Sequence, residues 1–432
     1  MGLPACGCRI QPAVTHSIET FGTSIEFQEH VMKKVVLAFS GGLDTTFCAV
    51  YLREELGYEV VTVTVDTGGF SKEELERIEE RARGLNVVKH YSIDGRRFVY
   101  DRFISYIIKG NSLRGNIYPL SVGAERVAQA VEVGKIAKKE GVEAVAHGST
   151  GAGNDQVRFD VALGVLVPDV EVLAPIRSLG WSRKREAQWL QERGVEVNLE
   201  VQDYSINEGL WGTTIGGKET HDSWEFPPEQ VFRKTKNVDD TPPEPLEVRI
   251  GFESGLPVSL DGKGAEGVRI VEELNRIAGA YGIGRGVHIG DTIMGIKGRI
   301  VFEAPAPILV IAAHRELEKL VLSKNQRFWK DHLGQVYGGM LHEGLFFDPV
   351  MRDIEALVDS SQQRVSGEVK IRLYRGTYLV TGVRSTHSMM KKELAVYGEE
   401  QQLWDWRDAE GFCRVYGVPS KLYGMQDGEF GE

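Results

Sequence analysis

The stretch AFSGGLDTTF, residues 38–47, joins a hydrophobic run to a segment with a helical pattern. Residues 34–39 predict a buried strand and residues 43–56 a helix. Between them, Gly41 and Gly42 permit positive φ and a close approach of a ligand to the backbone. The N–H groups and dipole at the start of the helix favour an anion. A tight capped turn is the alternative, but the strand, two glycines, hydroxyls and acid together favour a phosphate site.

The rest of the first half alternates strands and helices. Strands are expected at residues 59–66, 87–93, 142–147 and 170–174, and helices at residues 71–84 and 121–141. This rhythm predicts an α/β fold with a doubly wound parallel sheet and helices on both faces. The loops that follow the strands then lie at the carboxyl edge, where such sheets bind ligands.

The second half predicts an α+β domain. Residues 204–217 are polar and glycine-rich, and residues 239–245 are typical of a linker or exposed loop. Strands are expected at residues 246–252 and 369–383, the latter a hairpin turning near Gly376, and helices at residues 268–281 and 312–322. The boundaries we expect are a loosely ordered extension (1–31), a nucleotide-binding domain (32–200), a second domain (201–390) and a C-terminal tail (391–432).

Composition limits the class of protein. The 432 residues suit two domains, and the net charge of −11 disfavours nucleic acid as a partner. No apolar run is long enough to span a membrane. The four cysteines are too few for a disulfide scaffold, and we expect them to be reduced; they are Cys6, Cys8, Cys48 and Cys413. Residues 1–31 have neither the pattern of a secretory signal nor that of a transit peptide, so a cytoplasmic location is expected.

A second stretch, HGSTGAGNDQVRF at residues 147–159, follows the fourth expected strand. We therefore expect it at the same sheet edge as the first loop. Its three glycines allow close approach to a ligand, and Asn154, Asp155 and Arg158 add an amide, a carboxylate and a guanidinium. An α-amino acid requires a cation for its carboxylate and an acid for its ammonium. A capped loop with a surface arginine is the alternative interpretation.

These motifs resemble those of known families. SGGLDTT, residues 40–46, lacks the Walker and dinucleotide-binding patterns and resembles the pyrophosphate-binding loop of the N-type ATP pyrophosphatases. HGSTGAGNDQVRF resembles the motif of the argininosuccinate synthase family. The likeness extends along most of the chain from residue 33, through residues 172–177, 204–211, 277–285 and 295–305.

The resemblance implies an ATP-dependent ligation in two steps. The ureido oxygen of citrulline attacks the α-phosphorus of ATP, which gives citrullyl-AMP and pyrophosphate. The amine of aspartate then displaces AMP and forms argininosuccinate. Electrostatic stabilisation by Mg²⁺ and loop amides, together with positioning, carries most of the rate. The competing interpretation is another N-type ATP pyrophosphatase that adenylates a different small-molecule acceptor.

The resemblance also implies site residues. ATP is expected at Ala38, Phe39, Ser40, Gly41, Gly42, Leu43, Asp44, Thr45, Thr46, Val65 and Gly148. Aspartate is expected at Thr150, Asn154 and Asp155, and citrulline at Asn154, Arg158, Ser205 and Thr214. Mg²⁺ is expected to arrive with ATP, and Asp44 is the candidate ligand. A homotetramer is implied, in which the tail with Trp404 and Trp406 packs on another subunit; an exposed amphipathic tail is the alternative.

The likeness breaks at the citrulline end. The family's Glu-Asn-Arg, whose Glu contacts citrulline, falls on residues 290–292 (GDT), and a family Tyr falls on Phe302. Residues 111–121 do not align with the family's Gly-Thr-Ser-Leu-Ala-Arg-Pro segment, so Tyr106, Arg114 and Tyr118 are all candidates for its role. Two hypotheses follow: an acceptor with an acylated, uncharged nitrogen, or plain citrulline bound through Asp291 or His288.

Overall fold

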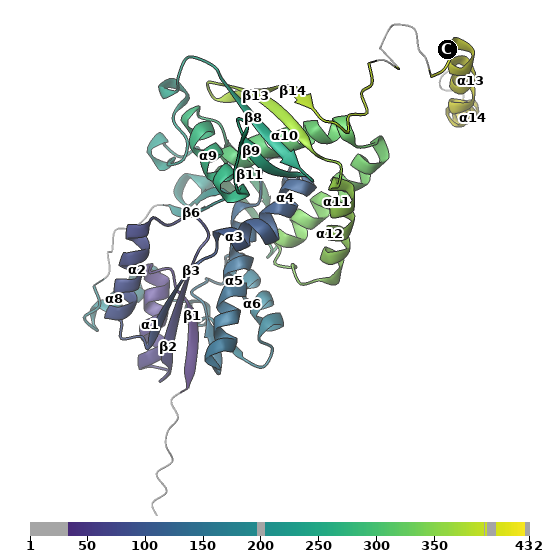
Figure 1. Cartoon of the computed structure of the whole chain (residues 1–432). Helices are drawn as coiled ribbons and strands as arrows, with labels where there is room; N and C mark the ends of the chain where they lie inside the picture. The colour runs from purple at the N-terminus through teal and green to yellow at the C-terminus, as the bar shows by residue number, and fades with distance from the viewer. Residues whose placement is uncertain (1–32, 197–203, 393, 395–402, 428–432) are drawn as a thin grey trace, which may run out of the picture. The chain divides into compact units, whose positions relative to one another are not determined.

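The computed structural model, drawn in Figure 1, describes residues 33–196, 204–392, 394 and 403–427. The extension expected at residues 1–31 lies outside the described residues. In the part of the chain that is described, no helix has the length and apolar character needed to cross a membrane.

The first half is built on a five-stranded sheet in the order β3-β2-β1-β4-β5, and every neighbouring pair is parallel. The strands are β1 (Lys34–Ala38), β2 (Glu59–Asp66), β3 (Lys89–Asp94), β4 (Ala144–Ala146) and β5 (Glu171–Leu173). The chain adds β2 and β3 on one side of β1 and then returns to place β4 on the other side. The carboxyl ends of β1 and β4 therefore flank the topological switch point. This confirms the predicted doubly wound α/β fold.

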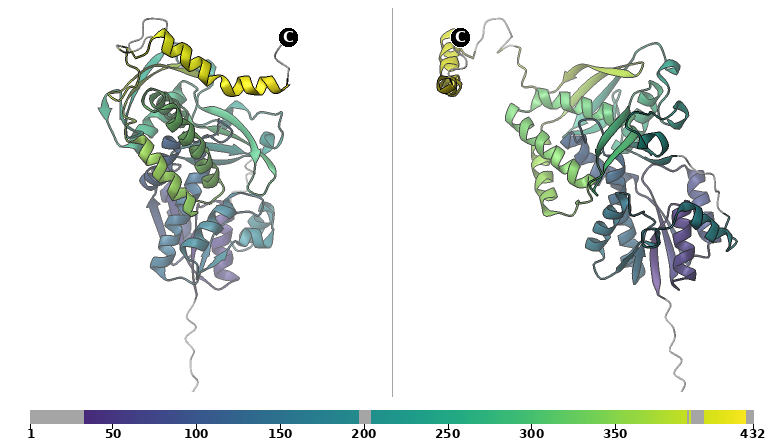
Figure 2. Two further views of the ribbon diagram at one scale, coloured as in Figure 1. Left: turned by 90° about the vertical axis from the view of Figure 1, so that its right-hand side faces the viewer. Right: turned by 180° about the vertical axis from the view of Figure 1, so that it is seen from behind.

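Helices cover both faces of this sheet, as Figure 2 shows. The first layer holds α1 (Leu43–Glu54), α2 (Lys72–Gly84) and α8 (Arg183–Gln191), and the second holds α5 (Ser121–Glu140) and α6 (Asp155–Leu166). Successive residues of β1 serve opposite layers: Val35 packs in the cluster of Phe47, and Val36 in the cluster of Phe159. After Lys34 the residues of β1 are all apolar, which is typical of a strand buried on both faces.

The second half contains two antiparallel sheets. One has the order β10-β9-β8-β13-β14 and the other β11-β12-β7-β6. Their strands are β6 (Ser205–Gly209), β7 (Gly212–Gly216), β8 (Leu246–Glu253), β9 (Leu256–Leu260), β10 (Lys263–Gly264), β11 (Arg285–Asp291), β12 (Lys297–Glu303), β13 (Gly367–Tyr374) and β14 (Thr377–Arg384). The helices are α9 (Gly267–Ala280), α10 (Pro305–Val321), α11 (Lys324–His342) and α12 (Pro349–Gln362).

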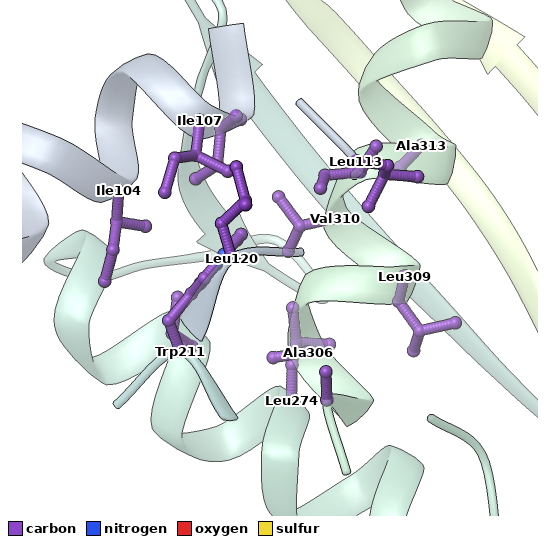
Figure 3. Close-up of a cluster of buried hydrophobic side chains, with 14 of the residues drawn as sticks. Ile104, Ile107, Leu113, Leu120, Trp211, Leu274, Ala306, Leu309, Val310 and Ala313 are labelled. Carbon is purple, nitrogen blue, oxygen red and sulfur yellow. The ribbon is translucent and has the colours of Figure 1, made fainter. Parts of the chain in front are cut away.

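One buried cluster joins the two halves of the chain (Figure 3). Ile104 and Ile107, from the π-helix η1 (Tyr100–Ile104) and α4 (Ser105–Gly110), lie near Trp211 and the α10 side chains. The indole Nε1 of Trp211 donates to the Pro119 carbonyl at 2.9 Å. The segment between α4 and α5 (residues 111–120) is thus held between elements of both halves.

Several elements differ from the sequence predictions. Helix α10 begins at Pro305 rather than at residue 312, because a proline is tolerated in the first helical turn. Residues 155–159, expected as loop, form the first part of α6, and residues 204–217 contain the β6–β7 hairpin. Helices α11 and α12 were not predicted. The hairpin near Gly376 is confirmed by the β13–β14 pairing.

The C-terminal tail contains two further helices, α13 (Trp406–Tyr416) and α14 (Val418–Asp427). Within the described residues of α13, none is buried. Trp404 and Trp406 are exposed, as are Phe412 and Tyr416. The tail therefore presents an uncovered apolar surface in a single chain.

Candidate active site

The loop after β1 forms the first part of the site. Gly41 has φ +72°, a conformation that favours glycine, and a Cβ added there would press on Ile78 Cγ1 at 3.0 Å. Gly42 is the N-cap of α1 and has no side chain to cap it. The first intrahelical bond runs from the Thr46 N–H to the Gly42 carbonyl at 2.9 Å. The N–H groups of residues 43–45 therefore remain for an anion.

The loop after β4 lies directly against this helix start. A Cβ at Gly148 would be 3.1 Å from Thr45 Cγ2 and 3.4 Å from the Thr45 nitrogen. Thr45 Oγ1 is also 3.3 Å from the Ser40 hydroxyl. Val65 lies near the carboxyl end of β2, two residues beyond Val63, which is the register partner of Ala38. The switch point thus brings together the residues predicted to bind ATP.

A polar cluster fixes the second loop. His147 Nδ1 accepts from the Ser149 N–H at 3.2 Å, so its Nε2 carries the proton and donates to Asp160 at 2.8 Å. Arg177 binds the same carboxylate at 2.6 Å. Burial opposes ionisation of Asp160, but His147 and Arg177 outweigh it and lower its pKa. Arg177 lies in one of the segments that resemble the family, and its guanidinium binds Gln156 and Asp160 of α6, which follows the loop.

Asp155 is held between two arginines. Its carboxylate lies 2.9 Å from Arg126 Nε and 2.8 Å from the Arg158 guanidinium. Burial raises the pKa of this group, and the two guanidiniums overcome that effect, so the pKa is lowered and the carboxylate stays ionised. Arg126 also donates to Asn207 Oδ1 at 2.5 Å. The sequence analysis missed Arg126. The available signal was its position as a charged residue in the first turns of α5, a helix whose other residues there are mostly buried.

Asn154 links the loop to the second half. Its Oδ1 accepts from the Ile293 N–H, in the β11–β12 turn, at 2.9 Å. The amide N–H groups of Asn154 therefore remain available to a ligand. Thr150 is exposed nearby, and its carbonyl accepts from the Gly153 N–H at 3.4 Å.

The β6–β7–β12 face supplies further groups. Thr214 pairs with Asn207 on one side and with Phe302 on the other, so the three share a face. Ser205, two residues before Asn207, lies on that face as well. Asn207 binds Arg126, so this face lies next to the Asp155 cluster, and the binding of citrulline by Ser205 and Thr214 stays a prediction.

The structure separates the three candidates in residues 106–118. The Tyr106 hydroxyl donates to Asp359 on α12 at 2.9 Å and belongs to a different cluster. The Tyr118 ring stacks on His288 with centroids 5.9 Å apart and lies 5.3 Å from Phe302. Burial raises the Tyr118 pKa to about 12, so its phenol keeps its proton.

Arg114 accompanies Tyr118. Its guanidinium donates to the Asp291 carbonyl at 2.6 Å, which connects the segment to the end of β11. Arg114 and Tyr118 therefore lie against the β11–β12 hairpin that Asn154 contacts, whereas Tyr106 lies against α12.

Two carboxyl groups beside the phosphate loop are candidates to hold a divalent cation. Asp44 Oδ1 and Glu186 Oε2 are buried atoms without a hydrogen-bond partner among the described residues, while Asp44 Oδ2 lies 3.3 Å from the Arg183 guanidinium. Burial, and then the Asp44 charge, raise the Glu186 pKa to about 7. Mg²⁺ usually takes one or two carboxylates together with phosphate oxygens and water, so this pair suits Mg²⁺ carried by a nucleotide. The described residues contain no group of three or more His, Cys, Asp or Glu side chains suited to a metal.

The fold and the two facing loops define an α/β enzyme that binds a nucleotide phosphate next to an amino acid. A family model described as the argininosuccinate synthase N-terminal HUP domain matches residues 34–196. The model of the C-terminal domain of the same family matches residues 204–423.

Curated relatives agree with these matches. The chain is 39% identical to the argininosuccinate synthase of Methanocaldococcus jannaschii over 392 residues, covering 90% of this chain and 98% of the relative. It is 39% identical to the Pyrococcus furiosus enzyme, covering 91% and 95%, and 39% identical to that of Symbiobacterium thermophilum, covering 90% and 97%. The chain belongs to the argininosuccinate synthase family.

Proposed function

We propose that this protein ligates citrulline to aspartate at the expense of ATP, forming argininosuccinate through citrullyl-AMP and releasing AMP and pyrophosphate. One observation carries the proposal: the phosphate loop after β1 and the Asp155 loop after β4 meet at the switch point, with Gly148 against Thr45. A nucleotide and an amino acid bound by these loops are adjacent, which is what adenylation followed by ligation requires.

The phosphate loop would bind ATP. The free N–H groups at the start of α1 and the hydroxyls of Ser40, Thr45 and Thr46 would donate hydrogen bonds to the departing pyrophosphate and stabilise its growing negative charge. Val65 and Gly148 would border the nucleoside. Mg²⁺ would be held by Asp44 and Glu186 and would neutralise phosphate charge when bound.

The second loop would bind the two amino acids. Asp155 and Thr150 would hold aspartate, and Asn154, Arg158, Ser205 and Thr214 would hold citrulline. The lowered pKa makes Asp155 a weak base, so its role is to hold the ammonium of aspartate and orient the amine for attack. Arg126, which fixes Asp155 and Asn207, is a positioning residue.

The assembly and location are also proposals. The exposed apolar side chains of α13 support the idea that the tail packs on another subunit of a homotetramer. The family resemblance and the acidic composition support a cytoplasmic enzyme with small-molecule substrates and no nucleic-acid partner.

The test is pyrophosphate release with ATP, Mg²⁺, citrulline and aspartate, with the ligated product identified by mass spectrometry. Asp155→Asn should lower kcat/KM for aspartate by about 100-fold or more, because the ammonium loses its charged partner. Asp169→Asn, an exposed site in the loop after α6, is the matched control and should stay within about twofold. Turnover that ignores aspartate, or equal effects of the two variants, would contradict the proposal.

A further inference from the structure

A cavity adjoins the residues that are expected to bind citrulline. It has a volume of about 340 Å³ and lies between residues 113–120 and α11. Leu113 and Leu120 give it an apolar side, which suits a methylene chain. Arg114 and Glu343 are the charged residues of its described lining. The cavity therefore combines an apolar wall with one cation and one acid.

Arg114 connects the cavity to the Asn154 loop. Its guanidinium donates to the Asp291 carbonyl at 2.6 Å. Asn154 accepts at 2.9 Å from the N–H of Ile293, two residues further along, in the turn between β11 and β12. Arg114 and Asn154 therefore contact the same end of the β11–β12 hairpin.

Glu343 lies next to Arg158. Arg158 Nε donates to the His342 carbonyl at 2.9 Å, and Glu343 is the next residue in the chain. A Cβ at Gly344 would lie 3.1 Å from Arg158 Cα, so the backbone on both sides of Glu343 packs against Arg158. Burial, and then the Arg158 charge, lower the His342 pKa to about 2, so the neighbouring imidazole is neutral.

The two charged side chains of the cavity are unpaired. Among the residues that the structure describes, no carboxylate lies within 4.0 Å of the Arg114 guanidinium and no cation within 4.0 Å of the Glu343 carboxylate. The guanidinium keeps N–H donors beyond the one that binds the Asp291 carbonyl. Opposite charges that line one cavity without pairing leave room for a zwitterion between them. An α-amino acid group carries the matching carboxylate and ammonium.

The other acids near this end are less suited to an ammonium. Glu125 is buried, and its Oε1 lacks a hydrogen-bond partner in the described part of the chain, but a Cβ at Gly209 would overlap that oxygen. The Glu125 carboxyl therefore packs against the Gly209 backbone. Burial raises its pKa to about 8, so it is mostly protonated at pH 7. Asp291 lies 2.6 Å from Lys297 and already has a cationic partner.

We propose that Arg114 and Glu343 bind the α-amino acid group of citrulline, with the carboxylate at Arg114 and the ammonium at Glu343. The ureido group then points toward Asn154 and Arg158. This inference rests on the proposed ligation and assigns the residues that select an α-amino acid as the ureido acceptor. A free acid at this position favours plain citrulline, whose α-nitrogen is charged, over an acylated form.

The experiment compares citrulline with two analogues that each lack one charge, using the full chain with ATP, Mg²⁺ and aspartate. δ-Ureidovalerate lacks the ammonium, and N-carbamoylputrescine lacks the carboxylate. Pyrophosphate release and product mass are measured, and each analogue is also tested as an inhibitor competitive with citrulline. We expect kcat/KM for each analogue to be at least about tenfold below that for citrulline. Equal use of all three would overturn this inference and leave the proposed function standing, whereas release with none of the three would overturn both.

Variants of Glu343 test the ammonium contact. Glu343→Gln should lower kcat/KM for citrulline about two- to fivefold, because the pair is exposed to solvent, and should leave the binding of δ-ureidovalerate unchanged. Glu343→Lys should lower kcat/KM for citrulline further and strengthen the binding of δ-ureidovalerate. Glu80→Lys, at an exposed position on α2, is the matched control. Equal changes for the two acceptors, or an effect of Glu125→Gln with Glu343→Lys silent, would refute the assignment.

Variants of Arg114 test the carboxylate contact. Arg114→Met should raise KM for citrulline about tenfold or more, spare N-carbamoylputrescine and leave KM for ATP unchanged. Arg114→Lys should restore part of the citrulline binding, because it keeps the charge. Arg97→Met, at an exposed pair on α3 (Arg96–Val99), is the control. An equal loss for all three acceptors would show that Arg114 only supports the segment, and it would overturn the proposal.

Discussion

A buried ion pair anchors the segment that carries Arg114 and Tyr118 to the site. Lys330 on α11 is fully buried, and its Nζ lies 2.6 Å from Glu318 and 2.7 Å from Asp331. Glu318 also accepts from Asn111 Nδ2 at 2.6 Å and from Gln362 Nε2 at 2.6 Å. Asn111 ends α4 in the left-handed conformation and begins the segment.

Lys330→Met leaves the Glu318 charge buried without its cation. Removing one partner of a buried pair costs about 3–5 kcal/mol. Unfolding entropy of about 2.1 cal/mol/K per residue, taken over about 400 residues, converts this into a fall in Tm of about 4–6 °C. Lys319→Met is the matched control, because Lys319 pairs with Glu316 on the exposed side of α10. That exposed pair contributes under about 1 kcal/mol.

The same variant should act on substrate binding. Because Glu318, which accepts from Asn111, is no longer held by Lys330, the Arg114 segment is held less firmly. We therefore expect KM for the acceptor to rise severalfold while KM for ATP stays constant. Thermal unfolding and steady-state kinetics measure the two effects. A double variant, Lys330→Met with Glu318→Leu, should recover stability, because it removes the stranded charge. A Tm equal to that of Lys319→Met would refute the reasoning.

Three further predictions concern single groups. Folding lowers the pKa of His342 from 6.5 to about 2, so the free energy of unfolding falls as pH drops below 6.5. Between pH 7 and pH 5 the parent protein should lose about 2 kcal/mol more of this free energy than His342→Asn does. Urea unfolding at the two pH values measures the difference. The Glu186 pKa is raised to about 7, so ionisation of Glu186 destabilises the fold as pH rises from 4.5 to 7. Glu186→Gln should therefore stabilise the Mg²⁺-free protein at pH 8 by about 1–3 kcal/mol. The same variant should raise the Mg²⁺ concentration needed for half-maximal pyrophosphate release about tenfold. An unchanged Mg²⁺ requirement would remove Glu186 from the metal site. Gly41→Ala should lower the free energy of unfolding by about 1–2 kcal/mol and raise KM for ATP, because alanine is strained at this positive φ. If adding Ile78→Ala restored both values, the contact with Ile78 and not the backbone conformation would be the cause.

The sequence alone determined the parallel sheet and its two loops. Strand β1 is largely apolar and β2 is rich in β-branched residues, and glycine-rich turns or capped helices follow them, so local pattern is sufficient to place them. The rule that ligands bind at the carboxyl edge then predicted that the loops of Gly41 and Gly148 lie at one edge. The same reasoning failed for α11, whose buried face includes glycines that carry no hydrophobic signal: Gly334 would place a Cβ 2.0 Å from the Gly110 carbonyl oxygen.

Only the tertiary structure decided which side chains meet. Arg126 reaches Asp155 and Asn207 across 29 and 81 residues of sequence, and no local pattern encodes those contacts. Tyr106 and Tyr118 are equivalent candidates in sequence, but α12 takes the first and the β11–β12 sheet the second. His288 takes the space beside Gly290 because a side chain occupies whatever volume its neighbours leave, and that volume exists only in the packed chain.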